Sequence, residues 1–288
     1  PRAMVRLASV RIVRRRLPLP ELLLDGLSVA AGSGRRRRTI LTEASLTIAR
    51  GEVVAVVGPS GGGKSTLLKA ILGLLPFSAG SIAFRGERAS QPLDRIHRLL
   101  RREAEAVFQN PVSALNPHRT LRHTIEEPLA AAGVPPPERR RRAAETAARM
   151  ELSGEVIDRR PAAVSVGQAQ RAAIARALAA RPALLFLDEP LSALDAIVAH
   201  EVAELLAETI REVCPTILMV SHDLRIVRRM ASRVIVVEAG RIVEDAPVSV
   251  FLDKPRSMAG CALLASDQRR RAVFERPTEA APAFDAAS

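Results

Sequence analysis

A glycine-rich segment between an apolar run and a helical pattern constrains this chain more than any other feature. The run 53–57 precedes the segment and the helical pattern 67–75 follows it. In this strand–loop–helix context a GxxxxGK[ST] string predicts a loop whose backbone N–H groups surround the β- and γ-phosphates of a nucleotide. Lys64 would neutralise phosphate oxygens, and Ser65 would offer its hydroxyl to Mg²⁺. The segment reads Gly58-Pro59-Ser60-Gly61-Gly62-Gly63-Lys64-Ser65-Thr66.

A second segment ends in two acidic residues. The apolar run 184–187 predicts a buried strand, and Asp188 and Glu189 follow it directly. By itself an Asp-Glu pair at a strand end is more often part of a solvated loop. Beside a phosphate loop, one carboxylate can reach the bound metal and its neighbour can deprotonate the water that attacks the γ-phosphate. We therefore expect Asp188 to bind Mg²⁺ and Glu189 to act as the general base.

The rest of the pattern predicts an α/β fold. Short apolar runs between residues 22 and 57 are separated by turn residues, which is typical of antiparallel strands. Further on, the buried-strand patterns 216–220 and 234–237 alternate with the helical spans 168–180 and 196–213. Such alternation predicts a mostly parallel sheet that helices cover on both faces.

Composition excludes several classes of protein. The net charge is +12, and all but three of the 43 basic residues are arginine. Trp and Tyr are absent, so aromatic platforms for stacking bases are not available and no nucleic-acid partner is expected. The two cysteines lie far apart, which argues against a disulfide framework or a zinc site. No apolar stretch approaches the ~18 residues of a membrane span.

Four further motifs occur in the order that ABC ATPases show, so the chain resembles that family. They are a Q-loop glutamine, a signature, a D-loop and a switch histidine. In this sequence they are Gln109 in Val107-Phe108-Gln109-Asn110-Pro111, the signature Val164-Ser165-Val166-Gly167-Gln168-Ala169-Gln170-Arg171, the D-loop Ser192-Ala193-Leu194-Asp195, and Ser221-His222-Asp223.

This resemblance implies a fold and a domain plan. The fold would be a RecA-like P-loop core with an antiparallel β subdomain and a helical subdomain, at about residues 88–160, inserted after the first helix. The ATPase domain would cover residues 21–265, between a basic leader at 1–20 and a flexible tail at 266–288. In the family, two such domains dimerise head to tail and enclose two ATP molecules, each between the phosphate loop of one subunit and the signature of the other.

The resemblance also implies roles for single residues. Ser165 and Gly167 would contact the γ-phosphate held by the opposite subunit, with Gln168 and Asp195 close by. The expected catalytic residues are Glu189, His222 and Gln109, the expected Mg²⁺ ligands are Ser65, Gln109 and Asp188, and ATP is bound by residues 58–66. The other histidines, His97, His118, His123 and His200, show no spacing typical of metal ligands and are expected at the surface.

The segment after Gln109 narrows the resemblance. Residues 108–120 are similar to the extended Q-loop of ATPases that serve peptide and nickel importers, and 158–161 and 221–227 favour the nickel branch. This likeness implies a peripheral subunit at the cytoplasmic face of the inner or plasma membrane. Its partners would be a second ATPase subunit, two permeases and a periplasmic or extracellular substrate-binding protein.

Two functional alternatives remain. An ABC ATPase that acts on DNA or the ribosome usually carries a coiled-coil insertion, zinc cysteines or a second cassette, and none of these is visible. A P-loop kinase would lack the signature and the D-loop.

The sequence departs from the family pattern at two places. The aromatic residue that stacks on adenine, expected near Ala30 or Ala31, is absent, which leaves an arginine of the run 35–38 as the alternative. Val166 replaces the first glycine of the signature, where the backbone has to approach phosphate closely. We therefore expect a weakened contact across the dimer, which favours a heterodimer over a homodimer.

Overall fold

A mostly parallel sheet forms the centre of the molecule, which confirms the expected α/β class. The computed structural model describes residues 20–32, 38–89, 95–109, 113, 115–192, 194–213 and 215–274. The strand order is β10-β9-β3-β8-β7-β6, and β10 alone in this sheet is antiparallel to its neighbour. The strands are β3 (Val53–Val57), β6 (Ala104–Val107), β7 (Leu184–Asp188), β8 (Thr216–Val220), β9 (Arg233–Glu238) and β10 (Arg241–Pro247).

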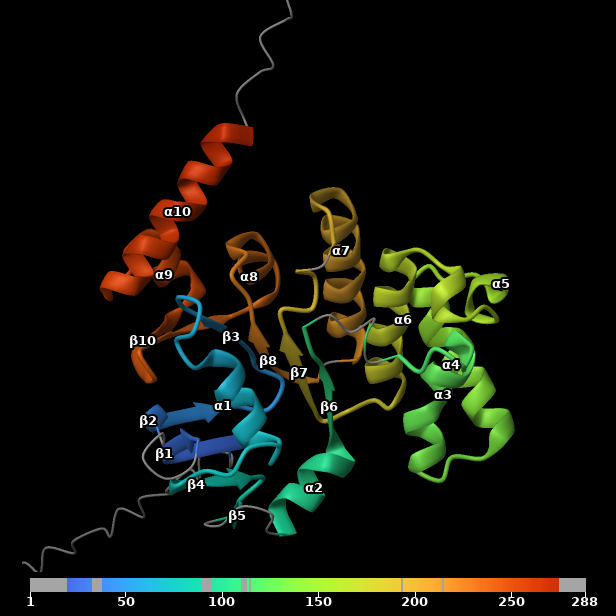
Figure 1. Cartoon of the computed structure of the whole chain (residues 1–288), viewed down its shortest axis with the longest axis horizontal. Helices are drawn as coiled ribbons and strands as arrows, with labels where there is room; N and C mark the ends of the chain where they lie inside the picture. Colours follow the sequence, from blue (N-terminus) through green and yellow to red (C-terminus); the bar gives the residue numbers. More distant parts are fainter. Residues whose placement is uncertain are drawn as a thin grey trace, which may run out of the picture.

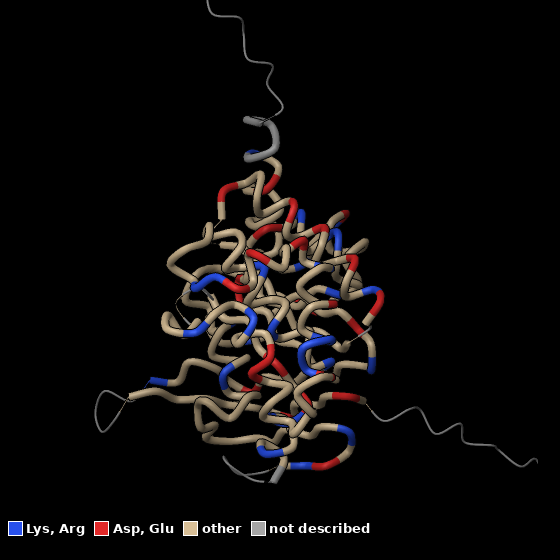
Figure 2. Tube along the Cα trace, turned by 90° about the vertical axis from the view of Figure 1, so that its right-hand side faces the viewer, with Lys and Arg blue, Asp and Glu red and all other residues tan. Residues whose placement is uncertain are grey.

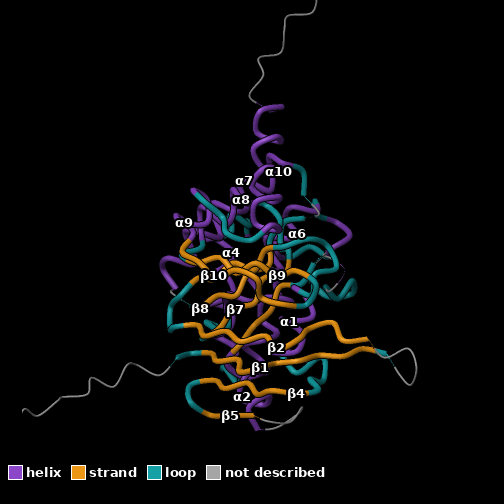
Figure 3. Tube along the Cα trace, turned by 90° about the vertical axis from the view of Figure 1, so that its left-hand side faces the viewer, coloured by secondary structure: helices purple, strands orange, loops and turns teal. Residues whose placement is uncertain are grey.

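A second, antiparallel sheet lies beside the first, as Figures 1 and 3 show. Its order is β2-β1-β4-β5, with Leu22 of β1 opposite Ile48 of β2. Helix α1 (Lys64–Ile71) begins inside the glycine-rich segment, directly after Gly63. The strands of the second sheet are β1 (Leu22–Ala31), β2 (Arg38–Ile48), β4 (Ala79–Phe84) and β5 (Glu87–Ala89).

Alternation along the central strands divides the hydrophobic core in two. In β7, Leu185 and Leu187 pack in the cluster that the later helices cover, whereas Leu184 and Phe186 pack in the cluster that contains α1 and the second sheet. Strands β3 and β8 alternate in the same way. Both faces of these strands are therefore buried, which explains their continuous apolar sequences.

A group of helices packs at one side of the sheet, at the right of Figure 1. The group begins after β6, later than the expected boundary near residue 88. Helix α2 (Arg95–Glu103) contacts β4, β5 and β6, and β6 pairs with β7, so both belong to the sheets. The members of the group are α3 (Leu121–Ala131), α4 (Pro136–Arg149), α5 (Gly154–Ile157) and α6 (Val166–Ala179), with a short 3₁₀ turn at Pro161–Ala163.

The C-terminal part of the described chain is helical. Residues 266–274, expected to belong to a flexible tail, continue helix α10 (Met258–Phe274). The Glu244 carboxylate accepts hydrogen bonds from the backbone N–H groups of Arg256 and Ser257 just before this helix. The expected leader, up to residue 19, and the tail from residue 275 lie outside the described residues. The other late helices are α7 (Ala196–Val213), α8 (Leu224–Met230) and α9 (Val248–Asp253).

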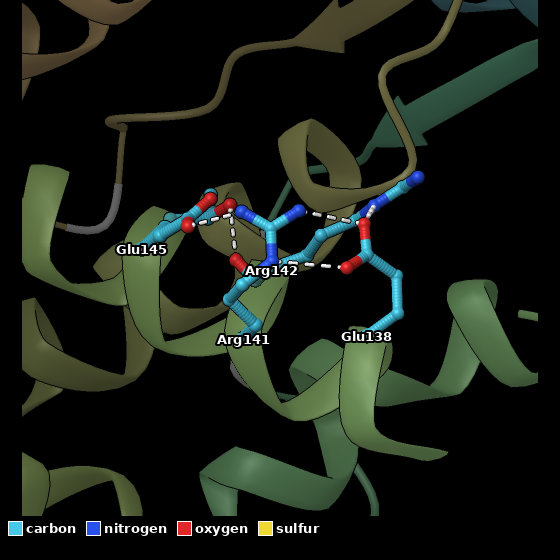
Figure 4. Close-up of polar contacts among 5 residues, drawn as sticks. Glu138, Arg141, Arg142 and Glu145 are labelled. Carbon is cyan, nitrogen blue, oxygen red and sulfur yellow. Dashed lines mark hydrogen bonds and ion pairs between the residues drawn. The ribbon is translucent and has the colours of Figure 1, made fainter. Parts of the chain in front are cut away.

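Two arginines of the run on α4 pair with acidic residues of the same helix (Figure 4). Arg141 contacts Glu138 at 2.7 Å and Glu145 at 2.5 Å, and Arg142 contacts Glu138 at 2.6 Å. These hydrogen bonds lower the pKa of Glu138 to about 2. Figure 2 shows acidic and basic residues interspersed along the trace. Glu138, Arg141, Arg142 and Glu145 thus form a surface ladder of i,i+3 and i,i+4 pairs.

One histidine lies elsewhere than expected. His97 is fully buried, whereas His118, His123 and His200 are exposed as predicted. The His97 ring lies 6.3 Å from the ring of Phe77 and packs on Gly73, where an added Cβ would come within 2.5 Å of it. The expectation for His97 was wrong because its neighbours come from the segment after α1, a tertiary contact that local sequence does not reveal.

Candidate nucleotide-binding and catalytic site

The glycine-rich loop runs from the end of β3 to the start of α1. Gly58, Gly61 and Gly63 have φ angles of 144°, 75° and 105°, which residues with a side chain rarely adopt. At Gly58 an added Cβ would also lie 2.0 Å from the carbonyl oxygen of Val237. The loop therefore requires glycine for both its backbone angles and its close packing.

The side chains that follow the loop contact the loop carbonyls and the end of β7. Lys64 is the first residue of α1, and its Nζ donates hydrogen bonds to the carbonyl oxygens of Gly58 at 2.9 Å and Pro59 at 2.8 Å. Ser65 Oγ donates to Asp188 Oδ1 at 2.9 Å. Burial lowers the pKa of Lys64 and raises the pKa of Asp188. A buried cation, a hydroxyl and a carboxylate thus meet at one end of the sheet.

Three strand ends bring the expected catalytic residues together. Glu189 follows β7, Gln109 lies just after β6 and His222 lies just after β8. Gln109 Nε2 donates to Glu189 Oε2 at 3.4 Å, and His222 Nδ1 lies 3.5 Å from Glu189 Oε1. The carboxyl ends of parallel strands meet at one edge, which is where open α/β sheets bind ligands.

The backbone fixes the Glu189 side chain in this position. Its φ angle of 49° lies in the left-handed region, and its N–H donates to the Val220 carbonyl at 3.0 Å. For a residue with a side chain this conformation is unfavourable, and such strain is common where function demands a geometry. The Glu189 carboxylate consequently faces the residues that follow β6 and β8.

The signature residues begin helix α6. Ser165 and Gln168 form a reciprocal cap, in which Gln168 N–H donates to Ser165 Oγ at 3.2 Å and Ser165 N–H donates to Gln168 Oε1 at 3.1 Å. At Gly167 an added Cβ would lie 2.8 Å from Val198 of α7, so glycine allows the two helix starts to approach. Val166 is 53% exposed.

The D-loop aspartate has a local structural role as well. Asp195 Oδ1 accepts hydrogen bonds from the backbone N–H groups of Ile197 at 3.1 Å and Val198 at 3.0 Å. The carboxylate therefore caps the start of α7. Within the described part of the chain, neither Ser165 nor Gly167 hydrogen-bonds to residues 58–66. The chain thus holds two separate groups of predicted site residues.

Sequence reasoning missed Gln170 and the turn after β9. Gln170 is fully buried, and its Nε2 donates to the Pro190 carbonyl, which joins α6 to the segment that carries Glu189. Its signal was available, because a glutamine inside an alanine-rich apolar helix needs a hydrogen-bond partner. The turn at 238–241 contacts the glycine-rich loop through Gly240, and the carbonyl of Val237 just before the turn packs against Gly58 and Gly62. Its signal was the Ala239-Gly240 pair between two apolar runs.

The described residues show neither a metal-binding cluster nor a membrane-spanning helix. No cluster of three or more His, Cys, Asp or Glu side chains there has the arrangement of a metal site. None of the described helices is long and apolar enough to cross a membrane.

The chain is similar in sequence to proteins of known families. A family model described as ABC transporter matches residues 41–192. The nickel import ATP-binding protein NikE of Shigella boydii serotype 4 (strain Sb227) is 39% identical over 248 residues, which cover 84% of this chain and 92% of that protein. The protein of the same name from Escherichia coli (strain K12) is 38% identical over 245 residues, 82% of this chain and 90% of that protein.

Solved structures give a similar result. The ATP-binding cassette MJ0796, in a dimeric structure of a post-hydrolysis state bound to ADP and Pi, has a TM-score of 0.70 with this chain. The two are 30% identical, and the match covers 79% of this chain and 98% of that one.

Proposed function

The chain belongs to the ABC transporter family as an ATP-binding subunit that hydrolyses ATP, and from that premise we propose that it energises the import of nickel. The observation that carries the catalytic part is the position of Glu189 between Gln109 and His222, beside the Lys64, Ser65 and Asp188 group. Similarity to the nickel import proteins supports the cargo. The proposed ATPase domain covers residues 21–265.

We assign the binding of the phosphates to residues 58–66. Their backbone N–H groups, together with the N-terminus of α1, favour negative charge at this position. Lys64 Nζ would exchange its loop carbonyl partners for phosphate oxygens, which stabilises bound ATP and the charge that develops during hydrolysis. The residues of the proposed phosphate loop are Gly58, Pro59, Ser60, Gly61, Gly62, Gly63, Lys64, Ser65 and Thr66.

The donor set beside the loop fits Mg²⁺. Ser65 Oγ and the buried Asp188 Oδ1 are hard oxygen ligands 2.9 Å apart, which is the kind of ligand that Mg²⁺ prefers. Gln109 would add an amide oxygen from the neighbouring strand end. When bound, the ion neutralises phosphate charge during transfer.

In the proposed mechanism, Glu189 accepts a proton from the attacking water. His222 and Gln109 contact the two oxygens of that carboxylate and would orient both the base and the water. Ser165 and Gly167 lie apart from this group and would complete the site of a partner subunit, with Gln168 and Asp195 supporting the two helix starts. The prediction of a heterodimer rests on Val166, which occupies the position of the first signature glycine.

The proposed assembly contains this subunit, a second ATPase subunit, two permeases and a substrate-binding protein outside the membrane. The subunit would sit at the cytoplasmic face as a peripheral component. We propose that the segment after Gln109 passes the closing and opening of the ATPase dimer to the permeases. A small peptide is the second candidate cargo, because residues 108–120 are similar to those of peptide importers as well.

Uptake of nickel by cells tests the proposal. Cells that lack the gene should accumulate less ⁶³Ni²⁺, the gene for the unaltered chain should restore uptake, and a Glu189→Gln version should not. A version with a substitution on the exposed α4 ladder, Glu145→Gln, serves as the control and should restore uptake fully. Unchanged nickel uptake together with lost growth on peptides would indicate that the imported cargo is a small peptide instead of nickel. Loss of sugar or amino-acid uptake alone would overturn it.

A further inference from the structure

The turn between β9 and β10, which we call the 238–241 turn, packs against the phosphate loop. Its two central residues, Ala239 and Gly240, have φ angles of 46° and 78°, and Arg241 pairs with Glu238 across it. A two-residue turn with both φ angles positive matches the twist of the strands that it connects. The turn is therefore a well-defined hairpin end with a fixed position relative to β9.

One residue of this turn, Gly240, joins two parts of the nucleotide site through its backbone N–H and its backbone carbonyl. The N–H of Gly240 donates to the carbonyl of Gly62 in the phosphate loop at 3.0 Å. The carbonyl of Gly240 accepts from the N–H of Thr42 in β2 at 2.8 Å. This row of backbone hydrogen bonds, which we call the Gly240 bridge, links the phosphate loop to the second sheet.

The Gly240 bridge is possible because Gly62, Gly63 and Gly240 have no side chains. An added Cβ at Gly240 would lie 2.2 Å from the Ile40 carbonyl oxygen, and one at Gly62 would lie 2.8 Å from the Val237 carbonyl oxygen. At Gly63 an added Cβ would lie 2.9 Å from the end of the Leu41 side chain and 3.2 Å from the Ile40 carbonyl oxygen. Backbone atoms cannot move away as the end of a flexible side chain can, so the three segments approach each other only through glycine.

The bridge also determines where a phosphate-binding donor points. A trans peptide is planar, and its C=O and N–H groups point in opposite directions. Because the Gly62 carbonyl points at the 238–241 turn, the N–H of Gly63 points away from it. That N–H belongs to the loop that we assign to phosphate binding.

We propose that Gly240 is a positioning residue for nucleotide binding: it holds the Gly62–Gly63 peptide in its binding orientation and ties the phosphate loop to β2. Thr39 of β2 pairs with Ala30 of β1, the place where the family's adenine-stacking aromatic is missing. With no aromatic side chain there, affinity depends more heavily on the phosphate end, whose shape the bridge maintains. This inference rests on the assignment of residues 58–66 as the phosphate loop.

A pair of glycine substitutions tests the proposal. Gly51 has a φ angle of 74°, close to the 78° of Gly240, but an added Cβ there meets nothing within 4 Å. Gly240→Ala and Gly51→Ala therefore introduce similar backbone strain, and only the first obstructs the bridge. Because the Gly63 N–H would lose its alignment with a charged phosphate oxygen, and a hydrogen bond to a charged group contributes about tenfold or more, we expect Gly240→Ala to weaken MgATP and MgADP binding by about tenfold or more in calorimetric titration. Gly51→Ala should bind as the unaltered chain does.

A second pair keeps the test valid if Gly240→Ala fails to fold. Thr42→Pro removes the N–H that donates to Gly240, whereas Thr42→Ala retains it. Thr42→Pro should weaken nucleotide binding several-fold, and Thr42→Ala should not. In steady-state turnover the loss should appear as a higher KM for ATP with a smaller change in kcat, because no group that touches the reacting atoms has changed.

The possible outcomes separate this inference from the proposed function. Equal nucleotide affinity of Gly240→Ala and Gly51→Ala, or of Thr42→Pro and Thr42→Ala, would overturn the bridge and leave the phosphate loop assigned. If both variants of a pair lost melting temperature and nucleotide affinity to the same extent, Gly240 would have only a structural role. An unaltered chain that does not bind MgATP would instead remove the phosphate loop assignment itself.

Discussion

Two regions of this chain carry predicted ATPase residues, and they are built differently. The first, which we call the Lys64 region, comprises the phosphate loop and the residues at the ends of β6, β7 and β8, and its side chains contact one another. The second, the Ser165 region, comprises the starts of α6 and α7, and its polar groups are used in capping those helices. Val166 and Ile197 beside them are 53% and 75% exposed.

The difference indicates which region can work alone. The Lys64 region has a cation, a hydroxyl–carboxylate pair that we propose as metal ligands and a candidate base within one chain, so we expect it to bind MgATP by itself. The Ser165 region presents a hydroxyl, a helix N-terminus and exposed apolar side chains, but no hydrogen bond joins Ser165 to the phosphate loop among the described residues. We therefore expect the Ser165 region to act only when a partner subunit brings its ATP against this helix start.

The largest expected effect comes from Lys64→Ala. Lys64 is the cation above the phosphate loop, and its removal leaves phosphate charge without its main neutralising group. We expect binding of MgATP to be lost in calorimetric titration, and turnover with it. Lys69→Ala is a matched control, because Lys69 is exposed on the same helix. If Lys64→Ala still bound MgATP, the Lys64 region would not bind the phosphates as proposed.

Glu189→Gln should affect the same region in a different way. The amide cannot accept the proton of water, but it keeps the size and much of the hydrogen bonding of the carboxylate. We expect MgATP binding to remain while turnover falls by ~10²-fold or more, which is the usual contribution of a general base. Phosphate release and nucleotide titration on the same preparation measure both quantities. Near-normal turnover would remove Glu189 as the base.

Ser165→Ala should leave the Lys64 region of its own chain intact. The substitution removes the hydroxyl that caps α6 and that we propose for the partner's γ-phosphate. MgATP binding to the isolated chain should therefore be unchanged, while turnover of the assembled dimer falls. Ser153→Ala, which removes a similar cap from the short helix α5, controls for loss of helix stability. If the isolated chain lost nucleotide binding, the two regions would not be separate.

Local sequence was sufficient where the pattern is local. The predicted strand 216–220 and helix 196–213 have the same bounds as β8 and α7, because buried runs and helical periodicity specify them directly. Strand β6 lies instead within the range, about 88–160, that the family resemblance implied for the helical subdomain, and its four residues with Glu105 among them show no clear strand period. Only pairing with β7 makes it part of the main sheet. Long-range register is a tertiary property that propensity does not encode.

The candidate site shows the same limit. Residues that lie in recognisable motifs could be predicted from sequence, because their types and their order match the chemistry of phosphate binding. Gln170 and the Gly240 bridge were missed because their partners, Pro190 and Gly62, lie 20 or more residues away in the chain. What connects them is a buried hydrogen bond or a close backbone approach. Both depend on how the elements are packed rather than on any neighbouring sequence.

The smallest expected effect concerns Val166, and it bears most directly on the difference between the regions. Val166 is the first residue of α6, where the family has a glycine that lets the backbone approach the phosphate of the other subunit. In a homodimer this altered signature would cover both ATP molecules. In the proposed heterodimer it covers only the partner's ATP, and the intact Lys64 region receives the partner's signature.

In that case the purified chain should hydrolyse ATP slowly, and addition of the partner ATPase should raise the rate beyond the sum of the two. Val166→Gly should then change the heterodimer's turnover by roughly two- to fivefold, or about 0.4–1 kcal/mol of activation free energy. The change should persist when Glu189→Gln inactivates this chain's own site, because it acts at the partner's site. Val166→Ala removes the branched side chain without the flexibility of glycine, and so separates closer phosphate approach from a loosened helix start. The heterodimer proposal would be wrong if the chain were fully active as a homodimer and Val166→Gly left that activity unaltered. Ser165 and its neighbours would then contact phosphate equally well with valine or glycine at position 166.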